Sequence, residues 1–156
     1  MSITIAVIEP GKNPYLKQVE GEEVERGGER EVSYLKAFQD EVGGLIEYFC
    51  PLWEDNPALI VNEEFLANGS APNRAIYANQ HLHDAGYLDQ MTYTHVPEVG
   101  ELYGLVLGTF IAVSYDEDGN PRDLPADEWE KVQEAFSGED SINSCLLEIL
   151  KIQAGR

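Results

Sequence analysis

The spacing of apolar residues along the chain predicts a series of short strands and helices. Residues 3–8 form a β-branched run that ends at a Pro-Gly pair, which predicts a buried strand and a turn, with residues 15–20 as the hairpin partner. Apolar side chains recur at helical spacing over residues 31–42, and the two glycines that follow are typical of a helix C-terminus. Residues 45–50 and 58–61 are apolar enough to predict two further strands.

The middle and the end of the chain divide in the same way. Residues 21–30 are polar and rich in glycine, so we expect a flexible loop, and residues 69–99 show no clear period and are interpreted as loop with short elements. Residues 105–115 give the strongest strand pattern and lead into a turn of Asp, Gly, Asn and Pro. Two amphipathic helices are predicted over residues 124–136 and 141–153.

Strands and helices alternate only loosely, which favours the α+β class. The expected fold is a small mixed, mostly antiparallel sheet with helices on one side and an appended C-terminal helix. A chain of 156 residues is long enough to bury one core. We therefore expect a single domain over residues 1–137, with loop insertions near 21–30 and 79–101, and a helical extension over 138–156 packed on it.

The charge balance narrows the classes of partner. The chain carries 29 acidic and 10 basic side chains, a formal net charge of −19. Direct binding to nucleic acid and adhesion to an anionic membrane both need a basic surface, so we expect neither. A basic protein surface, a metal ion or plain solubility remain as reasons for the acidity.

The sequence also bears on the compartment. No apolar run approaches the roughly 20 residues of a membrane-spanning helix, and the first residues do not resemble a signal peptide. Cys50 and Cys145 cannot form a disulfide framework, and each lies in an apolar context typical of a core residue. We therefore expect a protein of the cytoplasm.

The acidic residues are concentrated in one stretch of the sequence. Residues 98–140 hold 12 acidic and 2 basic side chains, a net charge of −10. Spread evenly over a folded surface of about 7,900 Å², the charge of the whole chain would be about fourfold more dilute than that of duplex DNA. A mimic of nucleic acid therefore requires that these acids converge on one face. The candidate partner-binding residues are Asp116, Glu117, Asp118, Asp123, Asp127, Glu128, Glu130 and Glu134.

Four stretches of the sequence carry a resemblance to a known family. In them the chain resembles the domain of unknown function 3846, an uncharacterised family found in phages, plasmids and bacterial genomes. The resemblance implies a small α+β fold and a mobile-element setting, and it implies no activity. The stretches keep the order and the approximate spacing of the family, and they are residues 5–11, residues 42–47, residues 61–64 with 72–76, and residues 108–113.

A polar set near the middle of the chain offers a second kind of site. Asn62, Glu64, Asn73 and Arg74 are its members. An arginine that faces carboxylates beside a strand end could grip a small ligand. The same residues could instead form a structural ion pair or lock a turn, since no nucleophile or base accompanies them.

Metal-binding and catalytic motifs are incomplete. His81 and His83 would share a face if they lay on a strand, with His95 later in the chain, but their spacing matches no standard zinc pattern. The turn at residues 116–120 lacks the glycine position and the final glutamate of a calcium loop. No serine lies in a nucleophile elbow, and no glycine-rich phosphate loop follows a strand. We therefore predict no enzyme, no metal and no cofactor.

The preferred hypothesis is a small acidic, non-enzymatic binding protein of phage or plasmid type. It would inhibit a host nucleic-acid-handling defence complex, such as a restriction or CRISPR effector, by placing a DNA-mimicking acidic face in a basic groove. The alternatives are a small-ligand-binding domain and a homo-oligomeric interaction domain. In the last case the C-terminal helix would form a homodimer through an apolar face, which comprises Ile142, Leu146, Ile149 and Leu150.

Overall fold

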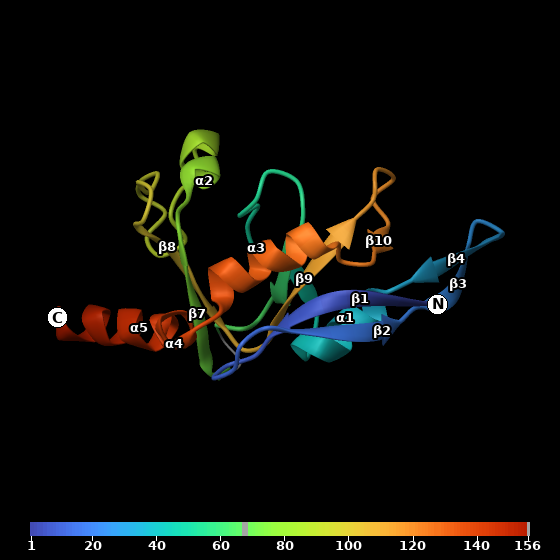
Figure 1. Ribbon diagram of the computed structural model, residues 1–156, viewed down its shortest axis with the longest axis horizontal. Coiled ribbons are helices and arrows are strands. Elements are labelled where there is room, and N and C mark those ends of the chain that lie inside the picture. Colours follow the sequence, from blue (N-terminus) through green and yellow to red (C-terminus); the bar gives the residue numbers. More distant parts are fainter. Residues whose placement is uncertain (67–68, 156) are drawn as a thin grey trace.

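A computed structural model describes residues 1–66 and 69–155 of the chain (Figure 1). It confirms the α+β class and the C-terminal helix, and every strand pair among the described residues is antiparallel. The elements in chain order are β1 (Ser2–Ile8), β2 (Tyr15–Glu20), β3 (Glu22–Arg26), β4 (Glu29–Ser33), α1 (Leu35–Val42), β5 (Ile46–Tyr48), β6 (Ala58–Asn62), β7 (Pro72–Tyr77), α2 (Gln80–Ala85), β8 (Leu102–Leu107), β9 (Phe110–Tyr115), β10 (Pro121–Arg122), α3 (Ala126–Phe136), α4 (Glu139–Ile142) and α5 (Ser144–Ala154).

The main sheet has the strand order β2-β1-β9-β6-β5, and β10 pairs with the end of β9. β1 and β2 form the hairpin that the sequence predicts, with Ser2 opposite Glu20 and Val7 opposite Tyr15. β9 lies at the centre, between β1 and β6. The pairs β3–β4 and β7–β8 form two separate small sheets, which Figure 1 shows at opposite ends of the molecule.

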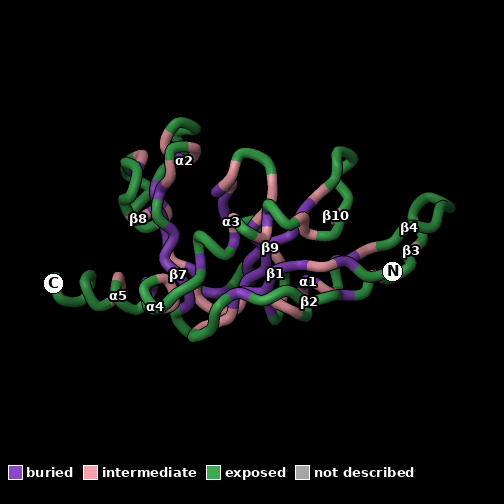
Figure 2. Tube along the Cα trace, viewed as in Figure 1, coloured by how far each residue is buried: buried purple, intermediate pink, exposed green. Residues whose placement is uncertain are grey.

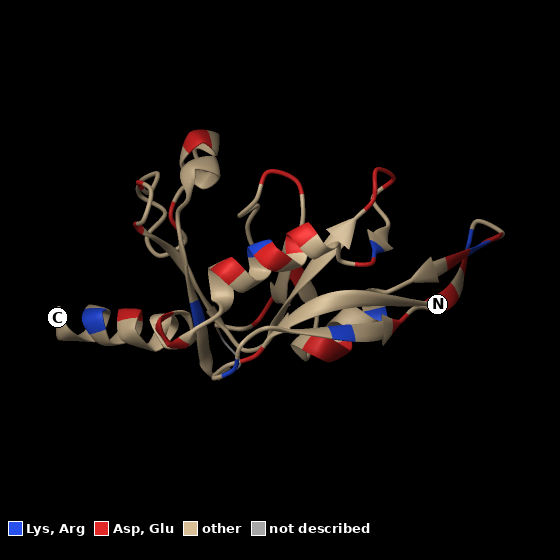
Figure 3. Ribbon diagram, viewed as in Figure 1, with Lys and Arg blue, Asp and Glu red and all other residues tan. Residues whose placement is uncertain are grey.

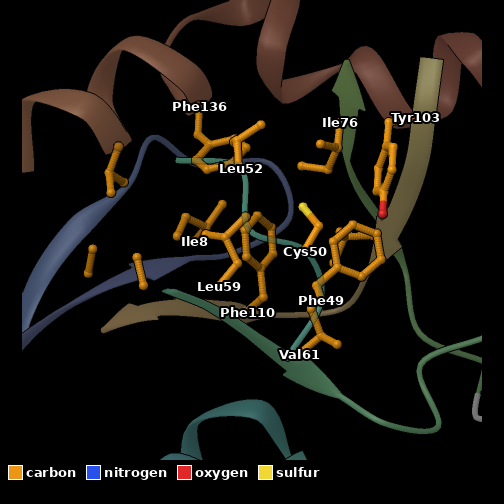
Figure 4. Packing of buried hydrophobic residues seen from close by; sticks show 14 of the residues in the cluster. Ile8, Phe49, Cys50, Leu52, Leu59, Val61, Ile76, Tyr103, Phe110 and Phe136 are labelled. Carbon is orange, nitrogen blue, oxygen red and sulfur yellow. The ribbon is translucent and has the colours of Figure 1, made fainter. Parts of the chain in front are cut away.

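Apolar side chains occupy both faces of the main sheet. Successive residues of β1, β6 and β9 belong alternately to two buried clusters, so that Ile5 joins one cluster and Ala6 the other. Phe38 of α1 packs in the first cluster, and Phe136 of α3 packs in the second, edge-on to Phe110 with 5.3 Å between ring centroids (Figure 4). Figure 2 shows the buried residues concentrated along these central strands. The sequence predicts helices on one side of the sheet, but α1 covers one face and α3 covers the other. The prediction is wrong because strands that are apolar on both faces need cover on both.

The strand predicted over residues 105–115 is two strands. β8 ends at Leu107 and β9 begins at Phe110, and the two lie in different sheets. Gly108 stands between them with a φ of 77°, in the left-handed region that glycine adopts without steric cost. A Cβ at this position would lie 3.0 Å from Oγ of Ser70. The apolar pattern conceals the break because buried residues continue on both sides of it.

Two segments that the pattern assigns to loops contain regular structure. The flexible loop predicted at residues 21–30 is a hairpin of β3 and β4, closed by two glycines with positive φ. β7 lies within the unpatterned segment 69–99 and pairs with β8. Its polar residues Asn73 and Arg74 are both fully buried, so the strand shows no alternation that a sequence pattern could detect.

The C-terminal helix α5 packs against β7. Oγ of Ser144 accepts the backbone N–H of Ala75 at 2.9 Å, and Cys145 is fully buried. Among the described residues, no helix combines the length and the apolar character needed to cross a membrane.

Candidate functional site

Acidic side chains from three separate segments meet at one groove of the molecule. The groove has a volume of about 540 Å³ and lies between the β9–β10 turn, the loop before β6 and the first half of α3. Figure 3 shows acidic positions on all three segments. We call it the acidic groove, and it is lined by Asp55, Asn56, Tyr115, Asp116, Glu117, Arg122, Asp127, Glu128 and Lys131.

The β9–β10 turn presents three acidic residues because one of them fixes its backbone. Oδ1 of Asp116 accepts the backbone N–H groups of Asp118 and Asn120, each at 2.9 Å. Hydrogen bonds of this kind are the reason why Asp is favoured at the start of turns. Glu117 and Asp118 remain exposed at the tip, so the structure places three of the predicted partner-binding residues together.

The loop before β6 adds acids that the sequence analysis did not select. Nδ2 of Asn56 donates to the carbonyl of Tyr115 at 2.9 Å, and Oδ1 of Asn56 accepts the N–H of Tyr115 at 3.0 Å. These bonds hold the exposed Asp55 beside the β9–β10 turn, and the exposed Glu54 precedes it in the chain. The sequence predicts a turn in this loop, but it does not predict that the turn lies against the end of β9.

Three acidic residues follow one exposed face of α3. Asp127, Glu130 and Glu134 stand at i, i+3 and i+7 and are all exposed. The helix rise separates these neighbours by about 4.5 and 6 Å along the axis, against an axial rise of about 3.4 Å per phosphate of one DNA strand. Nζ of Lys131, from the same helix, donates to the carbonyl of Asn56 at 3.3 Å.

Two of the eight predicted partner-binding residues lie outside this exposed set. Glu128 is only 4% exposed, and its Oε2 pairs at 3.2 Å with Arg122, whose Nε donates to Oγ of Ser114 at 2.9 Å. Glu128 is therefore a buried member of the groove and not part of an exposed face. Asp123 is exposed, but its Oδ1 accepts the N–H of Thr4 at 2.8 Å and ties the segment before α3 to β1.

Arg74, the centre of the predicted ligand grip, is fully buried and bound by the protein itself. Its Nε and Nη2 donate to the carbonyl of Phe136 at 3.1 and 2.9 Å, and its Nη1 donates to Oδ1 of Asn73 at 2.8 Å. The carbonyls of Glu9 and Lys12 accept from the same guanidinium. Burial lowers the pKa of Arg74 to about 10, so the group is still protonated near neutral pH. The cation thus stabilises the C-terminal end of α3, where the helix dipole favours positive charge, and it offers no N–H to a ligand.

The other members of the predicted grip do not join Arg74 in one site. Nδ2 of Asn62 donates to the carbonyl of Val42 at 3.1 Å, and Oδ1 of Asn62 accepts the N–H of Glu64 at 2.8 Å. Asn73 is buried, and its Nδ2 donates to two backbone carbonyls at 2.9 and 2.8 Å. Over residues 1–66 and 69–155, no hydrogen bond or ion pair connects the Asn62–Glu64 pair with Asn73 and Arg74. The structure therefore gives Asn62, Asn73 and Arg74 structural roles, whereas the side chain of Glu64 is exposed.

The histidines do not form one cluster. His81 and His83 lie on α2, where residues two apart point in different directions, so the premise of a shared strand face is wrong. Nδ1 of His83 lies 2.9 Å from the carbonyl of Pro97, and Nε2 of His95 lies 2.8 Å from the carboxylate of Glu101. In the described part of the chain, no group of three or more His, Cys, Asp or Glu side chains is placed to hold a metal ion.

Both cysteines lie in the core. Burial raises the pKa of the Cys50 thiol to about 12 and also raises the pKa of Cys145. Because the thiolate is the reactive form, neither side chain is activated as a nucleophile near neutral pH.

The sequence of this chain matches one known family. Residues 3–137 match the family described as "Domain of unknown function (DUF3846)". Comparison with curated proteins and with solved structures found no match. The matched region contains the whole acidic groove and all of α3, whereas α4 and α5 lie beyond it.

Proposed function

We propose a function from the premise that the chain belongs to the DUF3846 family, a domain of unknown function. We propose that the chain is a small non-enzymatic binding protein, which inserts an acidic face into the basic, nucleic-acid-binding surface of another protein. The observation that carries the proposal is the meeting of exposed acids from three segments. We define this acidic face as the four exposed acids that line the groove, Asp55, Asp116, Glu117 and Asp127, together with four exposed acids of the same three segments, Glu54, Asp118, Glu130 and Glu134.

The distribution of the charge supports the proposal more strongly than its total. Over a surface of 8890 Å², the net charge of −19 averages one charge per roughly 470 Å², against about one per 110 Å² for duplex DNA. The spacing on α3 is much closer to that of a nucleic-acid strand, and the groove brings Asp55, Asp116 and Glu117 near Asp127 at the start of the same helix. Such a surface accelerates association with a basic partner and makes the complex sensitive to salt.

A host defence complex is the class of partner that we propose. A restriction or CRISPR effector exposes a basic groove for nucleic acid, and a phage or plasmid benefits when that groove is occupied. This step rests on the mobile-element setting that the family resemblance implies. We propose that the protein acts in the cytoplasm of the host cell.

The test compares two variants that lose the same charge at different places. Asp127→Asn/Glu130→Gln/Glu134→Gln removes three charges from the acidic face, and Glu22→Gln/Glu29→Gln/Glu31→Gln removes three from the exposed β3–β4 hairpin. Each protein is immobilised and exposed to a bacterial lysate at low and at high salt, with duplex DNA as competitor, and the captured proteins are identified by mass spectrometry.

We expect the unmodified chain and the hairpin variant to capture nucleic-acid-binding proteins that salt and DNA release. The face variant should lose that capture. Equal loss in both variants would show that total charge alone governs binding, and capture that ignores salt and DNA would also contradict the proposal.

A second candidate function is self-association through α5. Leu146, Leu147 and Leu150 are about half exposed there, and Ile142 and Ile149 are partly covered by the rest of the protein. Burial of these leucines in a homodimer would be favourable. Sedimentation should then show a dimer that Leu146→Gln/Leu150→Gln dissociates, and a monomer at high concentration would refute this function.

A further inference from the structure

Glu128 carries a carboxylate oxygen without a partner in the lining of the acidic groove. Its side chain is 6% exposed, and its Oε2 is occupied by Arg122. Its Oε1 is buried and accepts no hydrogen bond from any described residue. A buried acceptor without a donor is unfavourable, so it calls for a structural explanation.

The start of α3 supplies that explanation. Glu128 is the third residue of the helix, where a glutamate ordinarily accepts the backbone N–H of the N-cap residue. The N-cap here is Pro125, which has no N–H to donate. Because this capping donor is missing, Oε1 lacks the partner that the helix start would otherwise give it, and a donor from outside the helix can take that place.

The cations already in the groove do not neutralise it. Arg122 is held by Ser114 and Glu128, and Lys131 donates to a backbone carbonyl. Five carboxylates face two basic side chains, which leaves a net charge of −3 in the lining. Over residues 1–66 and 69–155, no ion pair reaches the remaining four carboxylates, which belong to Asp55, Asp116, Glu117 and Asp127.

We propose that the acidic groove binds a guanidinium group, supplied by an arginine side chain. The planar guanidinium donates from several N–H groups at once, so it can pair with the carboxylates of Asp55 and Asp127 and, when the Glu128 side chain turns toward the groove, with its buried Oε1. The volume of about 540 Å³ falls within the range of small-molecule sites, about 300–1,000 Å³. That the arginine belongs to a partner protein rests on the proposed function, because a basic nucleic-acid-binding surface would present such a side chain. The affinity of the groove for a guanidinium group does not depend on the proposed function.

Other occupants fit the lining less well. The negative lining opposes a phosphate or a carboxylate. In the described part of the chain, the acids of the groove form no cluster able to hold a metal ion. An ammonium group carries the same charge but lacks the planar fork, so lysine should bind more weakly than arginine.

The test is an NMR titration of the ¹⁵N-labelled full chain with Nα-acetyl-arginine amide. Parallel titrations use Nα-acetyl-lysine amide, Nα-acetyl-glutamine amide and free arginine. Free arginine carries a carboxylate that an arginine side chain in a protein lacks, so it represents a metabolite. Asp127→Asn should weaken binding of the arginine amide about twofold to fivefold. Glu128→Gln should weaken it about tenfold or more. Glu29→Gln, on the exposed β3–β4 hairpin and outside both the groove and the acidic face, serves as the control.

We expect saturable shifts at groove residues for the arginine amide, weaker ones for the lysine amide and none for the glutamine amide. If free arginine binds more tightly than the amide, the ligand is a metabolite, and the proposal of a protein side chain is overturned. Absence of saturation, or equal losses in Asp127→Asn and Glu29→Gln, would overturn the site. If Glu128→Gln fails to fold, the comparison of these two exposed variants still decides.

The titration contains no partner protein, so it separates this site from the proposed function. Saturable binding together with salt-insensitive capture from lysate would retain the guanidinium site and overturn nucleic-acid mimicry. Salt-sensitive capture without saturable binding would retain mimicry and overturn the site.

Discussion

Replacement of Arg74 by alanine tests whether this buried cation serves stability or a ligand. The side chain is fully buried, and its N–H groups bind three backbone carbonyls and Oδ1 of Asn73. Two of these acceptors, the carbonyl of Phe136 and Oδ1 of Asn73, are themselves buried. Alanine would leave both without a donor and would also leave a cavity.

The expected cost follows from those two acceptors. A buried acceptor that loses its donor costs about 1–3 kcal/mol, so the pair and the cavity together should lower the free energy of unfolding by about 3–6 kcal/mol. This is a large part of the roughly 5–15 kcal/mol that stabilises an ordinary domain. For a chain of this length it corresponds to a fall in Tm of roughly 6–24 °C. Arg74→Lys should cost less, since one ammonium can satisfy some of the acceptors.

The assay is urea denaturation followed by circular dichroism, with Arg30→Ala as the matched control. Arg30 lies on the β3–β4 hairpin with its side chain 74% exposed, and it pairs with the surface glutamates Glu23 and Glu25. Its loss should cost less than about 1 kcal/mol. If Arg74→Ala is no more destabilising than Arg30→Ala, the structural role assigned to Arg74 is refuted. Ligand binding would then again be the favoured role of Arg74.

Three further predictions concern single residues away from the groove. Backbone N–H groups hold the pKa of Asp89 below its ordinary value, so Asp89 contributes stability above about pH 4 that is lost as the pH falls; Asp89→Asn should flatten the acid limb of a stability–pH curve. The hydrogen bond to Glu101 raises the pKa of His95, so its stabilisation is complete below about pH 6.5 and lost as the pH rises; His95→Gln should remove that slope. Gly108→Ala should lower the free energy of unfolding by about 1–2 kcal/mol, and an unchanged urea midpoint would contradict the left-handed conformation.

The sequence predicts most of the elements whose residues interact locally. The hairpin of β1 and β2, the strand β6 and the helices α1 and α3 follow from periodicity and from turn residues. It fails for β8 and β9, because the division at Gly108 depends on which sheet each half joins. It fails for β7 as well, because the buried polar residues Asn73 and Arg74 find partners only in the folded chain.

The candidate site is predictable only in part for the same reason. Helical spacing places Asp127, Glu130 and Glu134 on one face, and the turn that follows β9 gathers its own acids. Their proximity to Asp55 depends on the hydrogen bonds between Asn56 and β9, which no local pattern encodes. Convergence of charge is therefore a tertiary property, and neither composition nor clustering in sequence could have established it.

The position of Glu128 depends both on the local helix pattern and on the tertiary structure. It precedes the buried Val132 and Phe136 at i+4 and i+8, so the phase of α3 already places this acid on the covered face. An acid in that position is tolerated when a cation meets it, and β10 delivers Arg122 by pairing with the end of β9. The ion pair therefore connects α3 to the β9–β10 turn, which are two walls of the acidic groove. A guanidinium bound at Oε1 would act on this same pair, so occupation of the groove should stiffen the two segments that carry most of the acidic face.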